Sequence, residues 1–125
     1  MLHKKTVLLG VGSGPLTWVG VEVLRALQRA GARVRVLLSG DTEAFVPALT
    51  FQTLAGAQVI AASEVYGTVV GEHVCSLVQV VQESDVLLVV PAIPALLAKT
   101  AAACSDEALV RAILLHRGPV VLAFP

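Results

Sequence analysis

The residues best suited to chemistry form a glycine-rich turn near the start of the chain, Gly10–Pro15 (GVGSGP). This turn follows a short apolar run, Thr6–Gly10, and precedes a segment in which apolar residues recur at helical spacing. Glycine lets the backbone approach a ligand closely, and the unpaired N–H groups at the start of a helix attract anions. Ser13 in the turn, and Ser39 and Thr42 after the second apolar run, supply hydroxyl groups. The pattern favours a phosphate-binding turn over a purely structural one.

The turn does not match the usual dinucleotide fingerprint. Its glycines, Gly10, Gly12 and Gly14, alternate with other residues, so the third glycine of GxGxxG is displaced. No acidic residue directly ends the second apolar run to hold a ribose, although Asp41 follows closely. The chain also lacks the GK[ST] sequence of a P-loop. A nicotinamide-binding Rossmann domain therefore stays only as a disfavoured alternative.

Apolar strands and helical segments alternate along the chain and would hold this turn at the edge of a sheet. Strands are expected at residues 6–10, 33–38, 58–61, 86–90 and 119–123, with helices at 16–30, 47–56, 73–82, 95–103 and 106–115. Crossovers between such strands are right-handed and give parallel pairing. The order predicts one α/β domain over residues 1–125, with a three-layer Rossmann-like (flavodoxin-like) fold and a parallel sheet of about five strands. Ligands bind such sheets beyond the carboxyl ends of the strands.

Composition narrows the possible partners. The chain is 56% hydrophobic and 14% charged, with a net charge of zero. The apolar excess suits parallel strands buried on both faces, and it hints that copies of the chain cover part of the surface. No cluster of Lys and Arg indicates nucleic-acid binding. Because no segment suits a membrane span or a signal peptide, we expect a soluble, cytoplasmic protein.

Four further residues have ordinary structural interpretations. Asp106 and Glu107 are adjacent and point in different directions on a helix, so we expect an N-terminal cap rather than an acid/base pair. Cys75 and Cys104 lack the spacing of a metal site. We expect both to be free thiols packed as small apolar side chains, with a reactive Cys75 as the alternative. No metal site is predicted.

Three segments of the chain resemble the flavin-containing cysteine decarboxylase family, which includes phosphopantothenoylcysteine decarboxylase and the lantibiotic peptide decarboxylases. KKTVLLGVGSG (4–14) resembles the first strand and flavin-phosphate turn of that family. VRVLLSGDTEAFVPALTFQTLAG (34–56) is the most specific match, because Phe45-Val46 and Leu49–Gln52 fall at the family spacing. ESDVLLVVPAIPALLAKTA (83–101) resembles the segment that contains P-A-x-A-N-T. The resemblance covers almost the whole chain.

The resemblance implies FMN as cofactor. It places cofactor contacts at Gly12, Ser13, Gly14, Ser39, Thr42, Phe45, Pro91, Ala92 and Ile93. The turn would meet the phosphate, Ser39 the phosphate or the ribityl chain, Phe45 the ring or a subunit contact, and Ala92-Ile93 the isoalloxazine. His73 falls at the position of the family's active-site histidine, and a neutral imidazole there could act as a general base near pH 7.

Family members assemble as trimers, or as dodecamers of trimers, with FMN between subunits. The resemblance therefore implies that the chain's main partner is itself, as a homotrimer or larger oligomer. A cysteine-derived small molecule or a peptidyl-cysteine is the implied substrate class.

Three departures from the family pattern leave two functions open. The usual Gly-Ser order of the turn appears as Ser13-Gly14, followed by Pro15. Ala95 stands where the family has the asparagine that binds the substrate carboxylate, and the sequence stops about where the family's P-x-M-N-x-x-M-W motif begins. The chain is thus interpreted as a flavin-dependent decarboxylase (a lyase), or as a non-catalytic flavoprotein-like subunit or regulatory partner.

Overall fold

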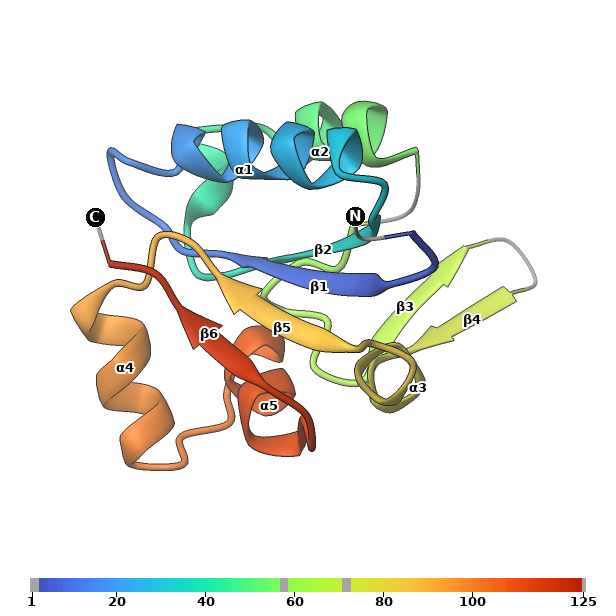
Figure 1. Ribbon diagram of the computed structural model, residues 1–125. Helices are drawn as coiled ribbons and strands as arrows, with labels where there is room; N and C mark the ends of the chain where they lie inside the picture. The colour runs from blue at the N-terminus through green and yellow to red at the C-terminus, as the bar shows by residue number, and fades with distance from the viewer. Residues whose placement is uncertain (1–2, 57–58, 71–72, 125) are drawn as a thin grey trace.

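The computed structural model describes residues 3–56, 59–70 and 73–124, except for the side chains of residues 68–75. Its elements in chain order are β1 (Thr6–Val11), α1 (Trp18–Arg29), β2 (Arg33–Leu38), the 3-10 turn η1 (Thr42–Ala44), α2 (Ala48–Ala55), β3 (Gly67–Val70), β4 (His73–Ser76), α3 (Leu77–Gln82), β5 (Val86–Val89), α4 (Pro94–Ala101), α5 (Ala108–Leu115) and β6 (Val120–Leu122). Figure 1 shows three layers, with α1 and α2 above the main sheet and α3, α4 and α5 below it.

The main sheet has the strand order β2-β1-β5-β6, and all of its pairs are parallel. At its centre, Leu9 of β1 lies opposite Val36 of β2 on one side and Leu88 of β5 on the other. Parallel neighbours need crossover connections, which the helices on both faces provide. The predicted three-layer α/β fold is therefore confirmed.

The core is divided between the two faces of the sheet. Leu8 and Leu9 of β1 are both fully buried, and successive strand residues point to opposite faces. Leu9 packs in one cluster with Leu24 of α1 and Phe51 of α2. Leu8 packs in the other cluster with residues of the lower helices, including Leu96 of α4. Burial on both faces explains why β1 is an uninterrupted apolar run in the sequence.

Residue 58 of the predicted strand at 58–61 lies outside the described residues, and residues 59–61 form a single parallel bridge, between Ile60 and Leu37, so the main sheet of the described chain has four strands rather than about five. The chain turns immediately after the bridge. The Glu64 N–H donates to the Ala61 carbonyl at 3.0 Å, and the Glu64 carboxylate accepts from the Ala61 N–H at 2.8 Å. These bonds use the Ala61 backbone groups, and so the strand ends there.

The predicted helix at 73–82 is confirmed for its second part and wrong for its first four residues. Residues 73–76 form β4, which pairs antiparallel with β3, and only residues 77–82 are helical. β3 itself lies between residues 61 and 73, where the sequence analysis expected neither a strand nor a helix. The backbone N–H and C=O groups of residues 73–76 are paired with β3 across the hairpin. The spacing of apolar residues within one segment does not show such a pairing.

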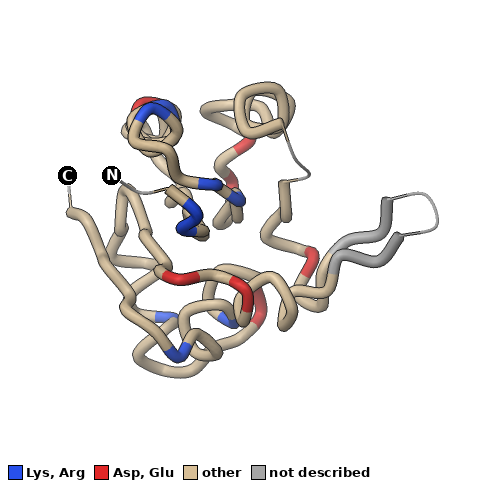
Figure 2. The backbone as a smooth tube through the Cα atoms, turned by 45° about the vertical axis from the view of Figure 1, so that its right-hand side comes forward, with Lys and Arg blue, Asp and Glu red and all other residues tan. Residues whose placement is uncertain are grey.

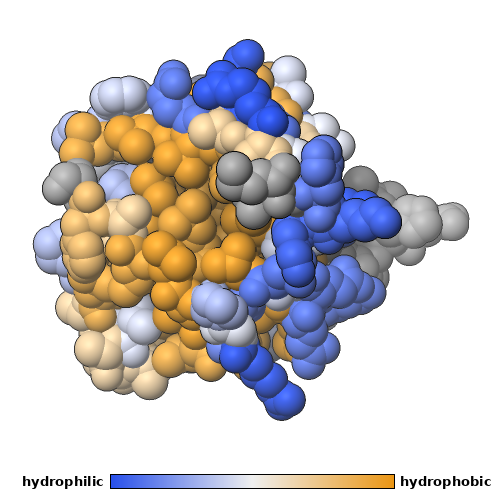
Figure 3. Space-filling model, in the orientation of Figure 1, coloured by the Kyte–Doolittle hydropathy of each residue, from blue (hydrophilic) through white to orange (hydrophobic). Residues whose placement is uncertain are grey.

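One side of the molecule is apolar over β6 and α4 (Figure 3). β6 is the last strand of the main sheet, so one of its edges has no neighbour within the described chain. The exposed large apolar side chains of β6 and of the segment after it include Val121, which is 48% exposed, and Phe124, which is 66% exposed. Trp18 at the start of α1 is also exposed. Such a surface is typical of an interaction site.

Charged residues are mixed rather than grouped by sign. Figure 2 shows acidic positions among the basic ones on both sides of the sheet. Among the described residues, the tube shows positions of both signs in the helices and in the segments around the sheet. In this same part of the chain, no helix has the length and apolar character to cross a membrane.

Candidate functional site at the carboxyl edge of the sheet

The main sheet brings three of the predicted segments together at one edge. β1, β5 and β2 are neighbours and run parallel, so the segments that follow them lie side by side. These segments are 10–14, 39–42 and 91–93, and their strands end at the left of Figure 1. The Val90 N–H donates to the Gly10 carbonyl at 2.9 Å, and the Ser39 N–H donates to the Val11 carbonyl at 3.0 Å. The strand ends are therefore hydrogen-bonded up to the point where the turns begin.

Two glycines of the turn are required by its geometry. A Cβ at Gly12 would overlap the carbonyl oxygen of Pro91, so only glycine allows the first turn to lie against the end of β5. Gly14 has a φ of +131°, a conformation that other residues rarely adopt. Among the described residues, nothing lies within 4 Å of the position that a Gly14 side chain would take. The turn is thus packed on its inner side and open on its outer side.

Thr17 holds this turn from beneath, and the sequence analysis did not identify it. Its hydroxyl lies 2.9 Å from the Gly12 carbonyl and 2.8 Å from the Gly14 carbonyl, and its side chain is fully buried. The Thr17 N–H also donates to the Gly14 carbonyl at 3.1 Å. A threonine immediately before the helix that starts at Trp18 was a signal that could have found it.

Ser13 reaches across to the segment that follows β2. A Cβ built on Gly40 would lie 3.2 Å from the Ser13 hydroxyl, and Gly40 has a φ of +50°. The first turn and the segment 39–42 therefore form one continuous surface. This arrangement confirms that the two segments meet at the carboxyl edge.

Thr42 carries a buried hydroxyl that no described group satisfies. The residue is 1% exposed, and its Oγ1 has no hydrogen-bond partner in the part of the chain that the structure describes. It lines a hollow of about 420 Å³ between residues 38–44 and 61–63. A buried hydroxyl without a partner costs free energy, so most such groups in proteins bind something. Thr42 therefore fits a ligand with a hydrogen-bonding group in this hollow, which the acidic residues Asp41 and Glu43 also line.

Ser39, in contrast, has a partner. Its hydroxyl donates to Oε1 of Glu107 at 2.6 Å, and both residues are buried. The other Glu107 oxygen lies 3.2 Å from the Lys99 ammonium, which also pairs with Asp106 at 3.3 Å. The two carboxylates, first Glu107 and then Asp106, raise the pKa of Lys99 above its usual value. The Glu107 carboxylate is thus hydrogen-bonded to Ser39, which was predicted to contact the cofactor.

The cap interpretation of Asp106 and Glu107 needs correction. Glu107 does occupy the position before α5, but its side chain makes no capping hydrogen bond. It reaches across the site to Ser39 instead. The two residues are far apart in the sequence, and nothing in the local pattern around Glu107 predicts the contact.

The remaining predicted contacts lie in the segments that follow β5 and η1. Ala92 and Pro91 are buried after β5, and Ile93 has its Cγ2 3.6 Å from the position of a Gly12 Cβ. Phe45 directly follows η1 and is 50% exposed. Partly exposed apolar side chains next to hydroxyl-bearing turns match a ligand with a flat ring and a phosphate. The roles of the individual residues stay predictions.

The structure does not bring His73 to this edge within one copy of the chain. Its backbone lies in β4, opposite Val70, in a hairpin that projects to the right of Figure 1, away from the carboxyl ends of the main strands. The side chains of His73 and Cys75 lie outside the described residues. Cys104 is a free thiol as expected, but it is exposed rather than packed in the core. Its segment follows the end of α4, where few neighbours are available to cover it.

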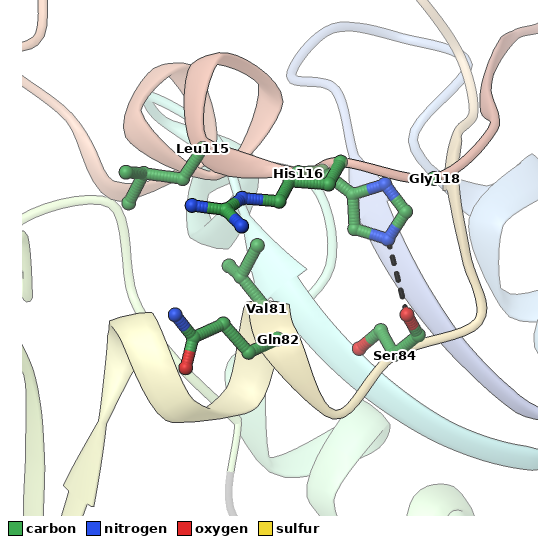
Figure 4. Close-up of a pocket in the computed structure, with 7 residues that line it drawn as sticks. Val81, Gln82, Ser84, Leu115, His116 and Gly118 are labelled. Carbon is green, nitrogen blue, oxygen red and sulfur yellow. Dashed lines mark hydrogen bonds between the residues drawn. The ribbon is translucent and has the colours of Figure 1, made fainter.

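A second hollow, of about 280 Å³, lies at the opposite edge of the sheet (Figure 4). His116 lies beside it, with Nε2 3.2 Å from the Ser84 carbonyl and a buried Nδ1 that has no described partner. Figure 4 shows the free nitrogen directed toward the backbone at Gly118 rather than into the hollow. Ligands bind sheets of this kind at the carboxyl edge, so this hollow is not the expected site. Within the described part of the chain, no cluster of His, Cys, Asp and Glu could hold a metal ion.

Comparison with known proteins identifies the family. The model of the family described as Flavoprotein matches residues 1–125. The chain belongs to the Flavoprotein family. This match confirms the family resemblance that was inferred from the sequence motifs.

Similar proteins agree with this assignment. The chain is 32% identical over 123 residues to the coenzyme A biosynthesis bifunctional protein CoaBC of Mycolicibacterium smegmatis, covering 98% of this chain and 28% of CoaBC. It therefore spans less than a third of that relative. Its fold matches two solved FMN-dependent cysteine decarboxylases. TvaF, from thioviridamide biosynthesis, has a TM-score of 0.80 and 24% identity, over 95% of this chain and 72% of TvaF. SpaF has a TM-score of 0.81 and 23% identity, over 98% of this chain and 69% of SpaF.

Proposed function

We propose that this member of the Flavoprotein family binds FMN at the carboxyl edge of its main sheet. The observation that carries the proposal is the turn at Gly12–Gly14, which lies against the end of β5 at Gly12 and has no described atom within 4 Å of the position of a Gly14 side chain, together with the Thr42 hydroxyl on the neighbouring segment, which has no partner among the described residues. The N–H groups of the turn and the start of α1 favour an anion. Ser13 adds a second hydroxyl next to Gly40. These groups suit the phosphate of FMN.

The rest of the flavin would lie along the segments after β2 and β5. Phe45 and Ile93 offer apolar surface for a flat ring. When bound, FMN would supply two-electron redox chemistry. The contribution of the chain is to bind the phosphate, to orient the ring and to cover one of its faces.

We further propose that the bound flavin serves the decarboxylation of a cysteine-derived carboxylate. TvaF and SpaF are FMN-dependent cysteine decarboxylases, and CoaBC acts in coenzyme A biosynthesis. His73 is the proposed general base. Because its backbone lies on the hairpin that points away from the edge, it would act in the site of another copy of the chain. This supports a homotrimer or larger oligomer, and the kinship with CoaBC favours a cytoplasmic location.

A non-catalytic flavoprotein subunit is the second candidate, and Ala95 favours it. Ala95 is exposed in the first turn of α4, at the same edge as the proposed flavin site. It has no polar group with which to bind the carboxylate of a substrate. In this case, FMN binding would persist without decarboxylation.

One preparation of the chain tests these proposals in order. The purified protein is mixed with FMN, and binding is measured from the quenching of flavin fluorescence and from the visible spectrum. Saturable binding supports the site, and T42V should weaken it. A chain that binds no FMN contradicts the proposed function. The loaded protein is then incubated with phosphopantothenoylcysteine or with a peptide ending in cysteine. Loss of CO2, measured as a change in product mass, supports the decarboxylase, whereas tight FMN binding without that loss supports the non-catalytic subunit.

A further inference from the structure

Two carbonyl groups of the glycine turn are bound from beneath by one side chain. The buried Thr17 hydroxyl lies 2.9 Å from the Gly12 carbonyl and 2.8 Å from the Gly14 carbonyl, and these two acceptors share its single proton. The Gly14 carbonyl also accepts from the Thr17 N–H at 3.1 Å. The Gly12 carbonyl has no second donor among the described residues. Its direction therefore depends on the Thr17 hydroxyl.

The direction of the Gly12 carbonyl fixes the direction of the next N–H group. The peptide bond between Gly12 and Ser13 is trans, and in a planar trans peptide the carbonyl and the N–H point in opposite directions. Because the Gly12 carbonyl is directed at the buried Thr17, the Ser13 N–H is directed away from it, toward the outer side of the turn. The peptide after Gly14 offers no such donor, since Pro15 has no N–H.

The Ser13 N–H is available to a ligand. It donates to no acceptor within the described chain, and the same is true of the Gly14 and Leu16 N–H groups beside it. We propose that Thr17 is a positioning residue for the phosphate of the flavin. It holds the peptide between Gly12 and Ser13 so that the Ser13 N–H, and not the Gly12 carbonyl, faces the phosphate. This inference rests on the proposed binding of FMN at the glycine turn.

Loss of the Thr17 hydroxyl would release this peptide. Glycine at position 12 accepts a wide range of backbone conformations, so the freed peptide can rotate. A rotated peptide would direct the Gly12 oxygen at the phosphate, and the partial negative charge of that oxygen would repel the phosphate oxygens. Riboflavin has the ring and the ribityl chain of FMN but no phosphate. Its binding therefore does not depend on the direction of this peptide.

The test compares FMN with riboflavin in the wild type, Thr17→Val and Thr17→Ser. Both dissociation constants are measured from flavin fluorescence, and the readout is the riboflavin constant divided by the FMN constant. Thr17→Val should lower this ratio about tenfold or more, which corresponds to the loss of one hydrogen bond to a charged group. Thr17→Ser keeps the hydroxyl and should keep the ratio of the wild type.

A merely structural role of Thr17 predicts a different result. A less stable variant has a smaller folded fraction, which raises both apparent dissociation constants by the same factor and leaves their ratio unchanged. Thr100→Val is the matched control, because the Thr100 hydroxyl donates to the Leu96 carbonyl at 2.9 Å in α4. This control removes the same kind of hydrogen bond outside the turn, and we expect it to keep the wild-type ratio.

The remaining outcomes separate this inference from the proposed function. A wild-type ratio in Thr17→Val, or an equal loss in Thr17→Ser, would overturn the inference while the chain still binds FMN. Equal affinities of the wild type for both flavins would also overturn it, because the turn would then not recognise the phosphate. If the wild type binds neither flavin, the proposed function fails and the inference fails with it.

A second variant covers the case in which Thr17→Val does not fold, as judged by circular dichroism. Thr17→Cys then replaces it, because a thiol is a much weaker donor than a hydroxyl. It should lower the ratio in the same direction, and an unchanged ratio would again overturn the inference.

Discussion

Replacing Gly12 with alanine tests whether the close contact between the glycine turn and the end of β5 builds the site. The Cβ of an alanine would overlap the carbonyl oxygen of Pro91, which belongs to the backbone. A flexible side chain could rotate away from the new methyl group, but a backbone carbonyl cannot. Either the turn or the segment after β5 must therefore move.

The loss of stability in G12A depends on how firmly the turn and the end of β5 are held in place. The Thr17 hydroxyl, at 2.9 Å from the Gly12 carbonyl, holds the turn from beneath. The Val90 N–H, bonded to the Gly10 carbonyl at 2.9 Å, holds the end of β5. Forcing an extra methyl group into a packed site costs about 1–3 kcal/mol. A loss of 1 kcal/mol lowers the Tm of a domain of this size by about 4 °C, so we expect a decrease of about 4–12 °C.

Gly56 provides the matched control. It ends α2 with a φ of +66°, and no atom of the described residues lies within 4 Å of the position of its missing Cβ. G56A should therefore lower the free energy of unfolding only by the cost of holding an alanine in the left-handed conformation, about 1–2 kcal/mol. It should leave flavin binding unchanged. Thermal melts and flavin titrations are run on both variants. We expect G12A to lose flavin binding as well as stability. A G12A chain with wild-type Tm and wild-type flavin affinity would refute the argument that this contact shapes the site.

Three further changes test other parts of the structure. Thr17→Val removes the hydroxyl beneath the turn, and we expect urea melts to show a loss of about 1–3 kcal/mol that Thr17→Ser largely avoids. Lys99→Met tests the raised pKa of Lys99: its pairing with Glu107 and Asp106 stabilises the folded state below pH 10.5 and is lost as the pH rises through the higher folded value. The melting temperatures of wild type and Lys99→Met should thus converge only above pH 10.5, and convergence at neutral pH would contradict this. Val121→Lys puts a charge on the exposed face of β6, so native mass spectrometry should show smaller assemblies than the wild type; an unchanged distribution would mean that the interface lies elsewhere.

The fold could be predicted where a segment is buried on both sides. The strands at 6–10, 33–38 and 86–90 were expected from short apolar runs, and each pairs in the main sheet. Burial on both faces makes β1 an apolar run, whereas β2 begins with Arg33 and Arg35, which are not buried, and is apolar on both faces only at its end, so the signal lies within each strand itself. The glycine turn was equally visible, because a close approach of two backbone segments requires glycine wherever it occurs.

The elements that were missed depend on partners elsewhere in the chain. Residues 73–76 form a strand because β3 lies beside them, and the described residues 59–61 form a single bridge because Glu64 closes a turn on Ala61. In both cases the segment alone is compatible with more than one structure. Tertiary contacts then decide which one forms, and a local pattern does not contain them.

The same distinction explains how far the candidate site could be predicted. Residue types and spacing suffice to bring Ser13, Ser39 and Thr42 to one edge, since this follows from the order of parallel strands. What each hydroxyl can do depends on groups that come from elsewhere. Glu107 lies 68 positions further along the chain and accepts the hydrogen bond that the Ser39 hydroxyl donates. No such partner contacts the Thr42 hydroxyl among the described residues. Two hydroxyls that look equivalent in the sequence therefore differ in the bonds that they can offer. A motif can locate a phosphate-binding edge, but the assignment of donors and acceptors within it needs the hydrogen bonds of the folded chain.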